Sequence, residues 1–292
     1  MSAVSILIPT YEPNPEHLRA ALESIIAQTF HAWSVLIHDD ASEKDVHSII
    51  EPFLNDPRIR FARSEARLGI GGNWNACLKE AKSEYVQFLF QDDLWEPNYL
   101  AHCVEILNRE STVGFVVANH KYLKEACHGE SEICHGERSR TMTKKQDIYD
   151  EVIAARHELM PGRQDRIAFL GSWMERGLRP NMIGEPSFVM LRRSLIERVG
   201  FFNTSMRQGL DFEYWIRCLL KTDWFFIPEN LGAFRVHAGG ASERNRLSRA
   251  GALDRLRCFR MLLKELPSGD LRRSAWRGMM RYMIGSTGRM LG

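Results

Sequence analysis

The chain has 292 residues, of which 44% are hydrophobic and 26% charged, and it carries a formal net charge of +2. This length suffices for one large or two modest domains, and the composition is that of a globular protein, which excludes the disordered and fibrous classes. The longest apolar runs, such as 4–9 and 113–118, are far shorter than the roughly 18 residues that a membrane-spanning helix requires, so no integral membrane segment is expected.

The first residues enter an apolar run directly, without the positively charged region and the long apolar region of a signal peptide. We therefore expect a cytoplasmic protein. Six cysteines are scattered along the chain, and four of them fall within apolar helical patterns, where a free thiol behaves as a small hydrophobic group. Disulfide bonds are not expected in a reducing compartment.

A strand followed by a helix opens the chain. Residues 4–8 form a short β-rich run, which Pro9 is expected to end because proline cannot donate a hydrogen bond to a central ladder. Asn14 and Pro15 then supply an N-cap and a first helical residue, and apolar residues repeat with helical period as far as Ile26.

The next strand, at 33–37, runs into an acidic loop that contains Asp39 and Asp40. The sequence Ser-Glu-Lys-Asp at 42–45 has the spacing of a capping box and predicts that a helix begins there. Asp39 therefore has two interpretations: it caps this helix, or it binds a ligand at the end of its strand. A weaker strand follows at 58–62.

A glycine-rich segment at 68–75 leads into a helix, and the apolar run 85–91 ends in two adjacent carboxylates, Asp92 and Asp93. Because burying an unpaired carboxylate is costly, both should lie where a strand leaves the core. A plain acidic turn is the alternative. Strands alternating with helices as far as 113–118 predict an α/β fold with a mainly parallel central sheet and helices on both faces.

Between about 124 and 145 the apolar pattern breaks down. The word Cys-His-Gly-Glu occurs at 127–130 and again at 134–137, within a polar stretch. A zinc site is one interpretation of the two Cys-His pairs, although their spacing matches no common zinc finger. We interpret the stretch as a surface insertion.

The later elements are predicted as helices at 167–175, 193–199, 209–217, 247–266 and 271–284, and strands at 188–191 and 224–227. Asp211 lies in the first turn of its helix, where the helix dipole stabilises an anion. We divide the chain into a domain at 1–243, with halves at about 1–120 and 165–243, and a basic helical extension at 244–292.

The extension contains twelve Lys or Arg and three Asp or Glu, a net charge of +9, which leaves −7 for the residues before it. Its amphipathic helices either lie on an anionic membrane surface or pack on the domain. We favour packing that leaves a basic patch for peripheral contact with the inner face of the membrane. Nucleic acid is not an expected partner, because no recognised binding motif accompanies the charge.

Four sequence words in register carry a family resemblance. They are Val-Ser-Ile-Leu-Ile-Pro-Thr-Tyr at 4–11, Asp-Asp-Ala-Ser at 39–42, Gln-Asp-Asp at 91–93 and Leu-Asp-Phe-Glu-Tyr-Trp at 210–215. Over residues 4 to about 240 the chain resembles the family 2 inverting glycosyltransferases of the GT-A fold. The resemblance implies transfer of a sugar from a nucleotide-diphosphate donor to a hydroxyl of a glycan or lipid-linked acceptor, in surface polysaccharide biosynthesis.

The resemblance also assigns roles to individual residues. Asp211 would be the catalytic base, and Asp92, with His237, would hold a divalent Mg²⁺ or Mn²⁺ ion. Asp39 would accept a hydrogen bond from the base of the donor, and Asp93 would help to bind donor or acceptor. The full set of implied donor-binding residues is Pro9, Thr10, Tyr11, Glu12, Asp39, Gly69, Asn75, Gln91, Asp92 and Asp93.

These roles agree with elementary chemistry. A departing sugar diphosphate gains negative charge, which a divalent cation stabilises. An alcohol is a poor nucleophile near pH 7, so a carboxylate such as Asp211 is needed to remove its proton. A structural role at the helix N-terminus is the alternative for Asp211, and His237 has a structural alternative too.

The chain departs from the family pattern at three positions. Phe90 stands where many relatives have an acidic residue, Leu210 where many have glutamate, and Trp74 where many have arginine. Trp74 either stacks on a base or packs inward, and we favour packing. Two alternative functions remain open: a sugar-nucleotide binding module that has lost turnover, and a nucleotidyltransferase, which would release pyrophosphate.

Overall fold

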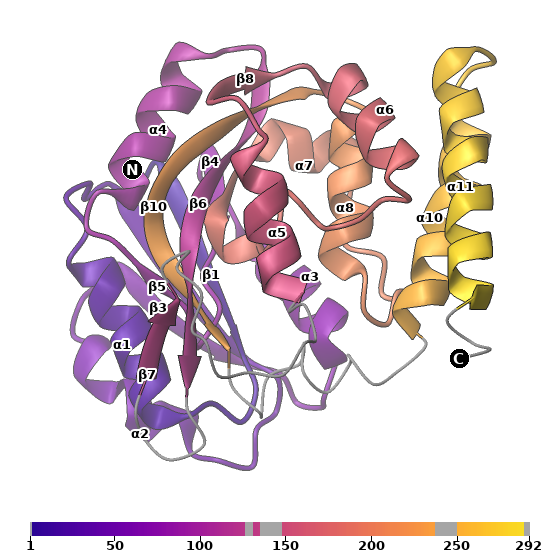
Figure 1. The fold of residues 1–292 in the computed structure, drawn as a ribbon. Helices are drawn as coiled ribbons and strands as arrows, with labels where there is room; N and C mark the ends of the chain where they lie inside the picture. Colours follow the sequence, from indigo (N-terminus) through magenta and orange to yellow (C-terminus); the bar gives the residue numbers. More distant parts are fainter. Residues whose placement is uncertain (1, 126–130, 135–147, 237–249, 289–292) are drawn as a thin grey trace.

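The computed structural model describes residues 2–125, 131–134, 148–236 and 250–288 of the chain. Within them, a curved sheet has helices against both faces (Figure 1), as predicted. The main path of the sheet is β3-β2-β1-β4-β9-β6-β10-β5, while β7 pairs with β6 and β8 pairs with β10. The strands are β1 Val4–Thr10, β2 Trp33–Asp39, β3 Ile59–Arg63, β4 Tyr85–Phe88, β5 Leu94–Trp95, β6 Val113–Glu125, β7 Ser131–Cys134, β8 Gly162–Gln164, β9 Val189–Arg192 and β10 Asp223–Val236.

Most strands of the main path run in one direction. β1 is parallel to both β2 and β4, β2 is parallel to β3, and β6 is parallel to β10. β9 lies antiparallel between β4 and β6, and β5 pairs antiparallel with β10. Because β1, β2 and β4 are parallel, their carboxyl ends lie at the same edge of the sheet, and the predicted acidic loops leave from that edge.

Two apolar layers cover the sheet, one on each face. Alternation along β1 places Ile6 and Ile8 in the layer with α1, α2 and α4, and Leu7 in the layer with α3, α6 and α8. The helices are α1 Pro15–Ile26, α2 Val46–Ile50, α3 Gly69–Glu80, α4 Tyr99–Arg109, α5 Ile148–His157, α6 Arg166–Glu175, α7 Arg193–Val199, α8 Leu210–Leu219, α10 Ala250–Glu265 and α11 Asp270–Gly288, with 3-10 turns at Glu51–Phe53 and Pro186–Phe188.

Pro9 does not end the first strand, contrary to the prediction. β1 continues to Thr10, and Pro9 remains in register with His38 of β2. The carbonyl of Leu7 accepts a hydrogen bond from the β4 side, and Pro9 has the same orientation as Leu7. Pairing with β4 stops at Leu7, so the missing N–H of Pro9 leaves no ladder bond unmade.

The predicted capping box at 42–45 was also wrong. Asp45 is the N-cap of α2 and accepts a hydrogen bond from the Ser48 amide. The Ser42 hydroxyl instead donates to the Asp39 carboxylate at 2.5 Å and accepts from the backbone N–H of Glu12 at 2.8 Å. The hydroxyl therefore joins the loops that follow β1 and β2, rather than opening a helix.

The segment after residue 113 has more regular structure than the sequence indicated. β6 continues to Glu125 and pairs antiparallel with β7, so a hairpin occupies part of the predicted insertion. Most of the Cys-His repeat lies outside the described residues. Helix α5 was missed because few of its residues are apolar and buried, namely Tyr149, Val152 and Ala155.

The C-terminal helices pack on the rest of the fold, at the right of Figure 1, as favoured from the sequence. Cys258, Phe259 and Leu262 of α10 are fully buried in the same apolar layer as α8. In α11, Gly278 lies against α6 so closely that an added Cβ would meet the Met174 carbonyl oxygen at 2.0 Å. The described part of the extension is therefore an integral layer of the fold.

Replacing Gly278 with alanine should test this close contact between α11 and α6. Because the added methyl group has no room, we expect Gly278→Ala to lower the free energy of unfolding by about 1–3 kcal/mol, measured by urea denaturation. Gly171→Ala is the matched control at the same interface, since its Cβ would meet Leu271 at an ordinary 3.5 Å. Removing a helical glycine there should stabilise the protein by up to about 1 kcal/mol. If both variants changed the free energy of unfolding equally, the close contact between α11 and α6 at Gly278 would be contradicted.

Candidate active site

A cavity of about 1040 Å³ opens where the loops after β1 and β4 leave the sheet. This is at the upper end of the size of ordinary small-molecule pockets. The opposite wall is made by α5, the segment that precedes β9, the start of α8 and helix α10. Residues widely separated in the chain therefore share one cavity, as expected at the carboxyl edge of an α/β sheet.

The predicted site residues divide into three groups. Those that line the cavity are Pro9, Thr10, Tyr11, Glu12, Gln91, Asp92 and Asp211. Four others, Asp39, Gly69, Asn75 and Asp93, are not part of its lining. His237 lies outside the described residues. The structure thus brings Asp92 and Asp211 to one cavity, although more than a hundred residues separate them.

The loop after β1 is tied to the loop after β4 through Gln91. The Gln91 side chain accepts a hydrogen bond from the Tyr11 amide at 2.9 Å and donates to the Tyr11 carbonyl at 3.3 Å. On the other side, the Arg67 guanidinium lies over the Tyr11 ring, 4.0 Å from its centroid. Tyr11 and Gln91 therefore form a fixed part of the cavity wall, with a positive charge beside it.

The two aspartates at the end of β2 make different contacts. Asp39 is fully buried, where its carboxylate accepts from Ser42 and lies 3.1 Å from Arg63. Asp40 lines the cavity and accepts the amides of Leu68 and Gly69 at 2.6 and 2.9 Å, which fixes the start of α3. Asp39 is not among the residues that line the cavity, and its contact with the base of the donor stays a prediction.

Helix α3 contributes an aromatic surface rather than a polar one. Trp74 stacks on Phe90 with ring centroids 4.9 Å apart, packs edge-on against Phe202, and lines the cavity with Phe90. Asn75 points away, since its amide exchanges two hydrogen bonds with the backbone of Phe202, at 2.8 and 2.9 Å. Asn75 therefore joins α3 to the segment before α8, and Gly69 is held by Asp40.

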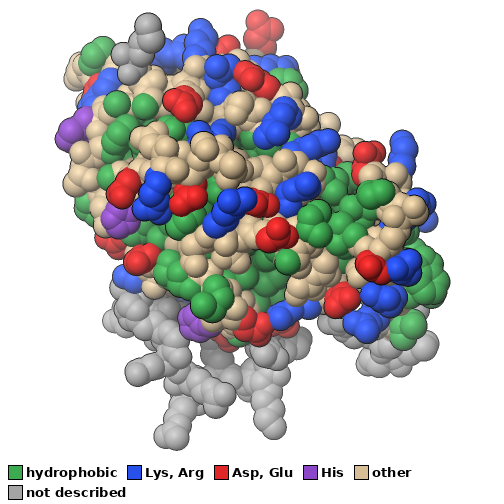
Figure 2. Space-filling view, turned by 90° about the horizontal axis from the view of Figure 1, so that it is seen from above, with side chains coloured by type: hydrophobic (Ala, Val, Ile, Leu, Met, Phe, Trp, Pro, Cys, Tyr) green, Lys and Arg blue, Asp and Glu red, His purple; other side chains and the backbone are tan. Residues whose placement is uncertain are grey.

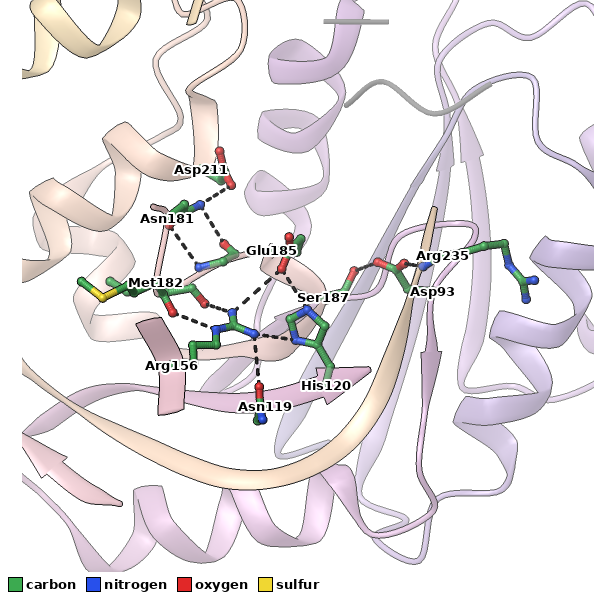
Figure 3. A network of polar contacts seen from close by, with 12 residues as sticks. Asp93, Asn119, His120, Arg156, Asn181, Met182, Glu185, Ser187, Asp211 and Arg235 are labelled. Atoms are coloured by element: carbon green, nitrogen blue, oxygen red, sulfur yellow. Dashed lines mark hydrogen bonds and ion pairs between the residues drawn. The ribbon is translucent and has the colours of Figure 1, made fainter. Parts of the chain in front are cut away.

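Asp93 is buried and lies outside the lining of the cavity, so its contact with donor or acceptor stays a prediction. Its carboxylate accepts from the Ser187 hydroxyl at 2.5 Å and from the Arg235 amide at 3.1 Å (Figure 3). Burial, and then the charge of Asp92, raise the pKa of Asp93 well above its usual value. Asp93 thus joins the loop after β4 to β10 and to the segment before β9.

Asp211 lies across the cavity, in the first turn of α8. The Asn181 amide donates to its carboxylate at 3.0 Å and orients it (Figure 3). Burial, together with the negative charge of Glu185, raises the pKa of Asp211 to about 7. A carboxylate with this pKa can accept a proton from a ligand at neutral pH.

Glu185 is a second carboxylate in this wall that sequence reasoning missed. One of its oxygens lies 3.1 Å from His120 and 3.9 Å from Arg156. Burial opposes ionisation of Glu185, but His120 and Arg156 outweigh it and hold its pKa below the usual value. Glu185 therefore stays ionised at pH values at which Asp211 takes up a proton, and separated pKa values of this kind are typical of acid–base sites.

Arg156 fixes the backbone that carries Glu185. It is almost fully buried and donates to the carbonyls of Met182 and Ile183 at 2.9 and 2.8 Å. Its guanidinium also lies 3.1 Å from His120 (Figure 3). The available sequence signal was the polar word Gly-Glu-Pro-Ser at 184–187, directly before a strand, but nothing in the pattern of α5 indicated a buried arginine.

Replacing Glu185 with glutamine should lower the pKa of Asp211. The variant removes the negative charge that disfavours ionisation, while burial, the larger cause, remains, so the pKa should fall below 7 yet stay above the 3.8 of an ordinary Asp. Carboxyl ¹³C NMR titration of the ligand-free protein measures this directly. Glu151→Gln, at another glutamate of the same cavity, should leave the pKa unchanged. If the pKa of Asp211 did not change in Glu185→Gln, the charge of Glu185 would not be a cause of the raised pKa.

Comparison with known proteins shows which family this chain resembles. Residues 5–159 match the model of "Glycosyl transferase family 2". The chain is 30% identical over 275 residues to the uncharacterized protein MT1568 of Mycobacterium tuberculosis, covering 93% of this chain and 79% of MT1568. It is 33% identical over 134 residues to WfgD of Escherichia coli, described as a UDP-Glc:alpha-D-GlcNAc-diphosphoundecaprenol beta-1,3-glucosyltransferase, covering 40% of this chain and 52% of WfgD.

The fold has relatives among solved structures. The mannosyltransferase PcManGT from Pyrobaculum calidifontis, in complex with GDP-Man and Mn²⁺, matches with a TM-score of 0.64 and 18% identity. The match covers 95% of this chain and 69% of that protein. At this identity the likeness concerns the fold, and it confirms the GT-A fold expected from the sequence.

Proposed function

Because this chain belongs to glycosyl transferase family 2, we propose that it is an inverting enzyme that transfers a sugar from a nucleotide-diphosphate donor to a glycan hydroxyl. The observation that carries the proposal is that Asp92 and Asp211 line opposite parts of one cavity. The name of WfgD supports a lipid-linked glycan as acceptor and a place in bacterial surface polysaccharide biosynthesis.

The donor side of the proposed site is the wall made by the loops after β1 and β4. Tyr11 is held there by Gln91 and Arg67, and Asp40 holds the start of α3. A nucleotide-diphosphate donor is polyanionic, so basic residues should face it. Lys44, Arg67 and Arg235 line the cavity near this wall, and Arg179, Arg207 and Arg255 line the opposite wall.

A divalent cation, Mg²⁺ or Mn²⁺, is part of the proposal, and the Mn²⁺ in PcManGT supports it. Among the described residues, no three His, Cys, Asp or Glu side chains form a metal-binding group. Asp92 therefore fits a cation that is held mainly by phosphate oxygens and water. When bound, the cation would stabilise negative charge on the diphosphate. His237 is retained as a proposed second ligand.

Asp211 is the proposed base. As the acceptor oxygen bonds to the anomeric carbon of the donor sugar, the Asp211 carboxylate takes the hydroxyl proton, and the bond from that carbon to the diphosphate breaks. The products are the lengthened glycan and a nucleoside diphosphate. Attack from the face opposite the diphosphate inverts the anomeric carbon. The pKa of Asp211, about 7, suits proton removal near neutral pH.

Asn181 and Glu185 support this step from the segment before β9. Asn181 donates to Asp211, which fixes the orientation of the carboxylate, while the charge of Glu185 makes Asp211 a stronger base. Glu185 itself is held by His120 and Arg156. These neighbours act through Asp211, so they are positioning residues in the proposed mechanism.

Asp211→Asn should separate binding from turnover. With Mn²⁺ and the nucleotide sugar that most raises the melting temperature, the variant should bind donor as the wild type does, but lose transfer about a hundredfold or more. Product NMR should show an inverted anomer. Binding without turnover in the wild type, for every acceptor tried, would favour the inactive binding module. Release of pyrophosphate instead of a nucleoside diphosphate would favour a nucleotidyltransferase.

Peripheral contact of the extension with an anionic membrane is the last element of the proposal, for an enzyme that acts at its cytoplasmic face. None of the described helices meets the length and hydropathy needed to cross a bilayer. In α11, Trp276 is 55% exposed among Arg272, Arg273 and Arg277, a combination suited to the interface of an anionic membrane. In Figure 2, hydrophobic side chains are exposed between charged ones at the end formed by α10 and α11.

Flotation with vesicles that contain anionic lipid tests this contact. The wild type should bind at low salt and dissociate as salt rises, and Trp276→Ala should bind severalfold less because it loses the apolar anchor. Phe201→Ala removes another exposed aromatic residue outside the extension and is the matched control. Failure of the wild type to bind at low salt would remove membrane contact from the proposal.

A further inference from the structure

Helix α10 of the C-terminal extension reaches the wall of the cavity. Gly251, Ala252 and Arg255 line it beside the turn 207–209, which leads directly into Asp211. The sequence had placed this helix outside the catalytic domain. Instead, α10 lies beside the turn that precedes Asp211.

The contact is centred on Asp254, a carboxylate that is only 1% exposed. One of its oxygens accepts three backbone N–H groups, those of Arg207 at 2.8 Å, Gln208 at 2.8 Å and Gly209 at 3.1 Å. Gly209 is the N-cap residue of α8 and makes no side-chain cap of its own. The Asp254 carboxylate therefore supplies, from another helix, the anionic acceptor that a helix N-terminus favours.

The other carboxylate oxygen of Asp254 is also fixed. It lies 3.0 Å from the Arg257 guanidinium, and the same guanidinium nitrogen donates to the Ser205 carbonyl at 3.0 Å. The segment 205–209 is thus held at its amides by Asp254 and at a carbonyl by Arg257. Both residues belong to α10.

The turn also lies in contact with α10 through its side chains. A Cβ added at Gly251 would meet the Gln208 side-chain oxygen at 2.3 Å, and one at Gly209 would meet the Asp254 Cβ at an ordinary 3.4 Å. On the far side of the turn, the Arg255 guanidinium lies 5.1 Å from the centre of the Phe212 ring, next to Asp211. The first turn of α8 is therefore held against α10 both before and after Asp211.

We propose that Asp254 is a positioning residue for Asp211, so that the C-terminal extension forms part of the active site. The inference rests on the proposed role of Asp211 as base. Proton transfer needs the base within hydrogen-bond reach of the acceptor hydroxyl, and a displacement of about 1 Å can reduce a rate about a hundredfold. Releasing the 207–209 turn would let the first turn of α8 shift by such an amount.

The test compares Asp254→Ala with Asp254→Asn in the full chain. Asp254→Ala should lower kcat at least about tenfold while the donor Kd changes less than about twofold, because the donor wall lies elsewhere. Asp254→Asn should recover part of the loss, since its amide oxygen can still accept from the three N–H groups. Asp270→Ala removes an aspartate from the first turn of α11, outside the cavity, and should leave kcat unchanged.

The pH profile distinguishes positioning from simple stabilisation. The charged groups that face the start of α8 are Glu185 from the segment before β9, Arg207 from the turn, and Asp254 and Arg255 from α10. If Asp254 positions Asp211, the ascending limb of the kcat profile should move in Asp254→Ala. A lower melting temperature with unchanged kcat and an unchanged limb would overturn the inference.

Two further measurements keep the inference testable. Arg257→Ala leaves Asp254 in place and loosens one contact of the turn, so it should fold and show a smaller loss of kcat than Asp254→Ala. NMR titration of Asp211 in ligand-free Asp254→Ala reports a displaced carboxyl group without any turnover. If the wild type transfers no sugar, the proposed function fails, whereas an unchanged Asp211 titration in this variant counts against positioning alone.

Discussion

Burial of carboxylates next to a cavity is the constraint on which this site depends. A buried carboxylate needs donors, and the segment 181–187 supplies one to each side of the cavity: Asn181 donates to Asp211, and Ser187 donates to Asp93. Between them, Glu185 is held by His120 and Arg156. One short segment therefore connects the loop after β4 with the start of α8, and it sets how far apart the two sides of the cavity lie.

The two Asp-Asp words differ in how their carboxylates are used. In the first, Asp39 and Asp40 are both buried, and both hold loops: Asp39 accepts from Ser42, and Asp40 accepts from the amides of Leu68 and Gly69. In the second, Asp93 is buried and accepts from Ser187, while Asp92 lines the cavity and is only half-buried. Of the four carboxylates, that of Asp92 is therefore the one that both lines the cavity and is not fully buried.

The sequence predicted the α/β class and the edge of the sheet that carries the site, because these follow from periodicity and from words at strand ends. The expectation that Asp92 and Asp211 share one cavity came from the family resemblance. It did not separate Asp39 from Asp40, since alternation at a loop depends on where pairing stops. Arg156 and Asp254 were missed because their partners are backbone groups of distant segments. A local sequence pattern does not indicate hydrogen bonds to the backbone of a distant segment. Pro9 was wrongly predicted to end β1 because the sequence did not show that the pairing of β1 with β4 stops at Leu7.

The contacts between α10 and the 205–209 turn limit which segments could be exchanged between this chain and its relatives. A hybrid that takes its first 243 residues from one parent and its C-terminal helices from another would bring together a turn and a carboxylate that had never been matched. The three amides of 207–209 that Asp254 accepts, and the Ser205 carbonyl that Arg257 contacts, would have to meet the same two side chains in the new parent. Exchange of these helices should therefore succeed best when the turn is exchanged with them.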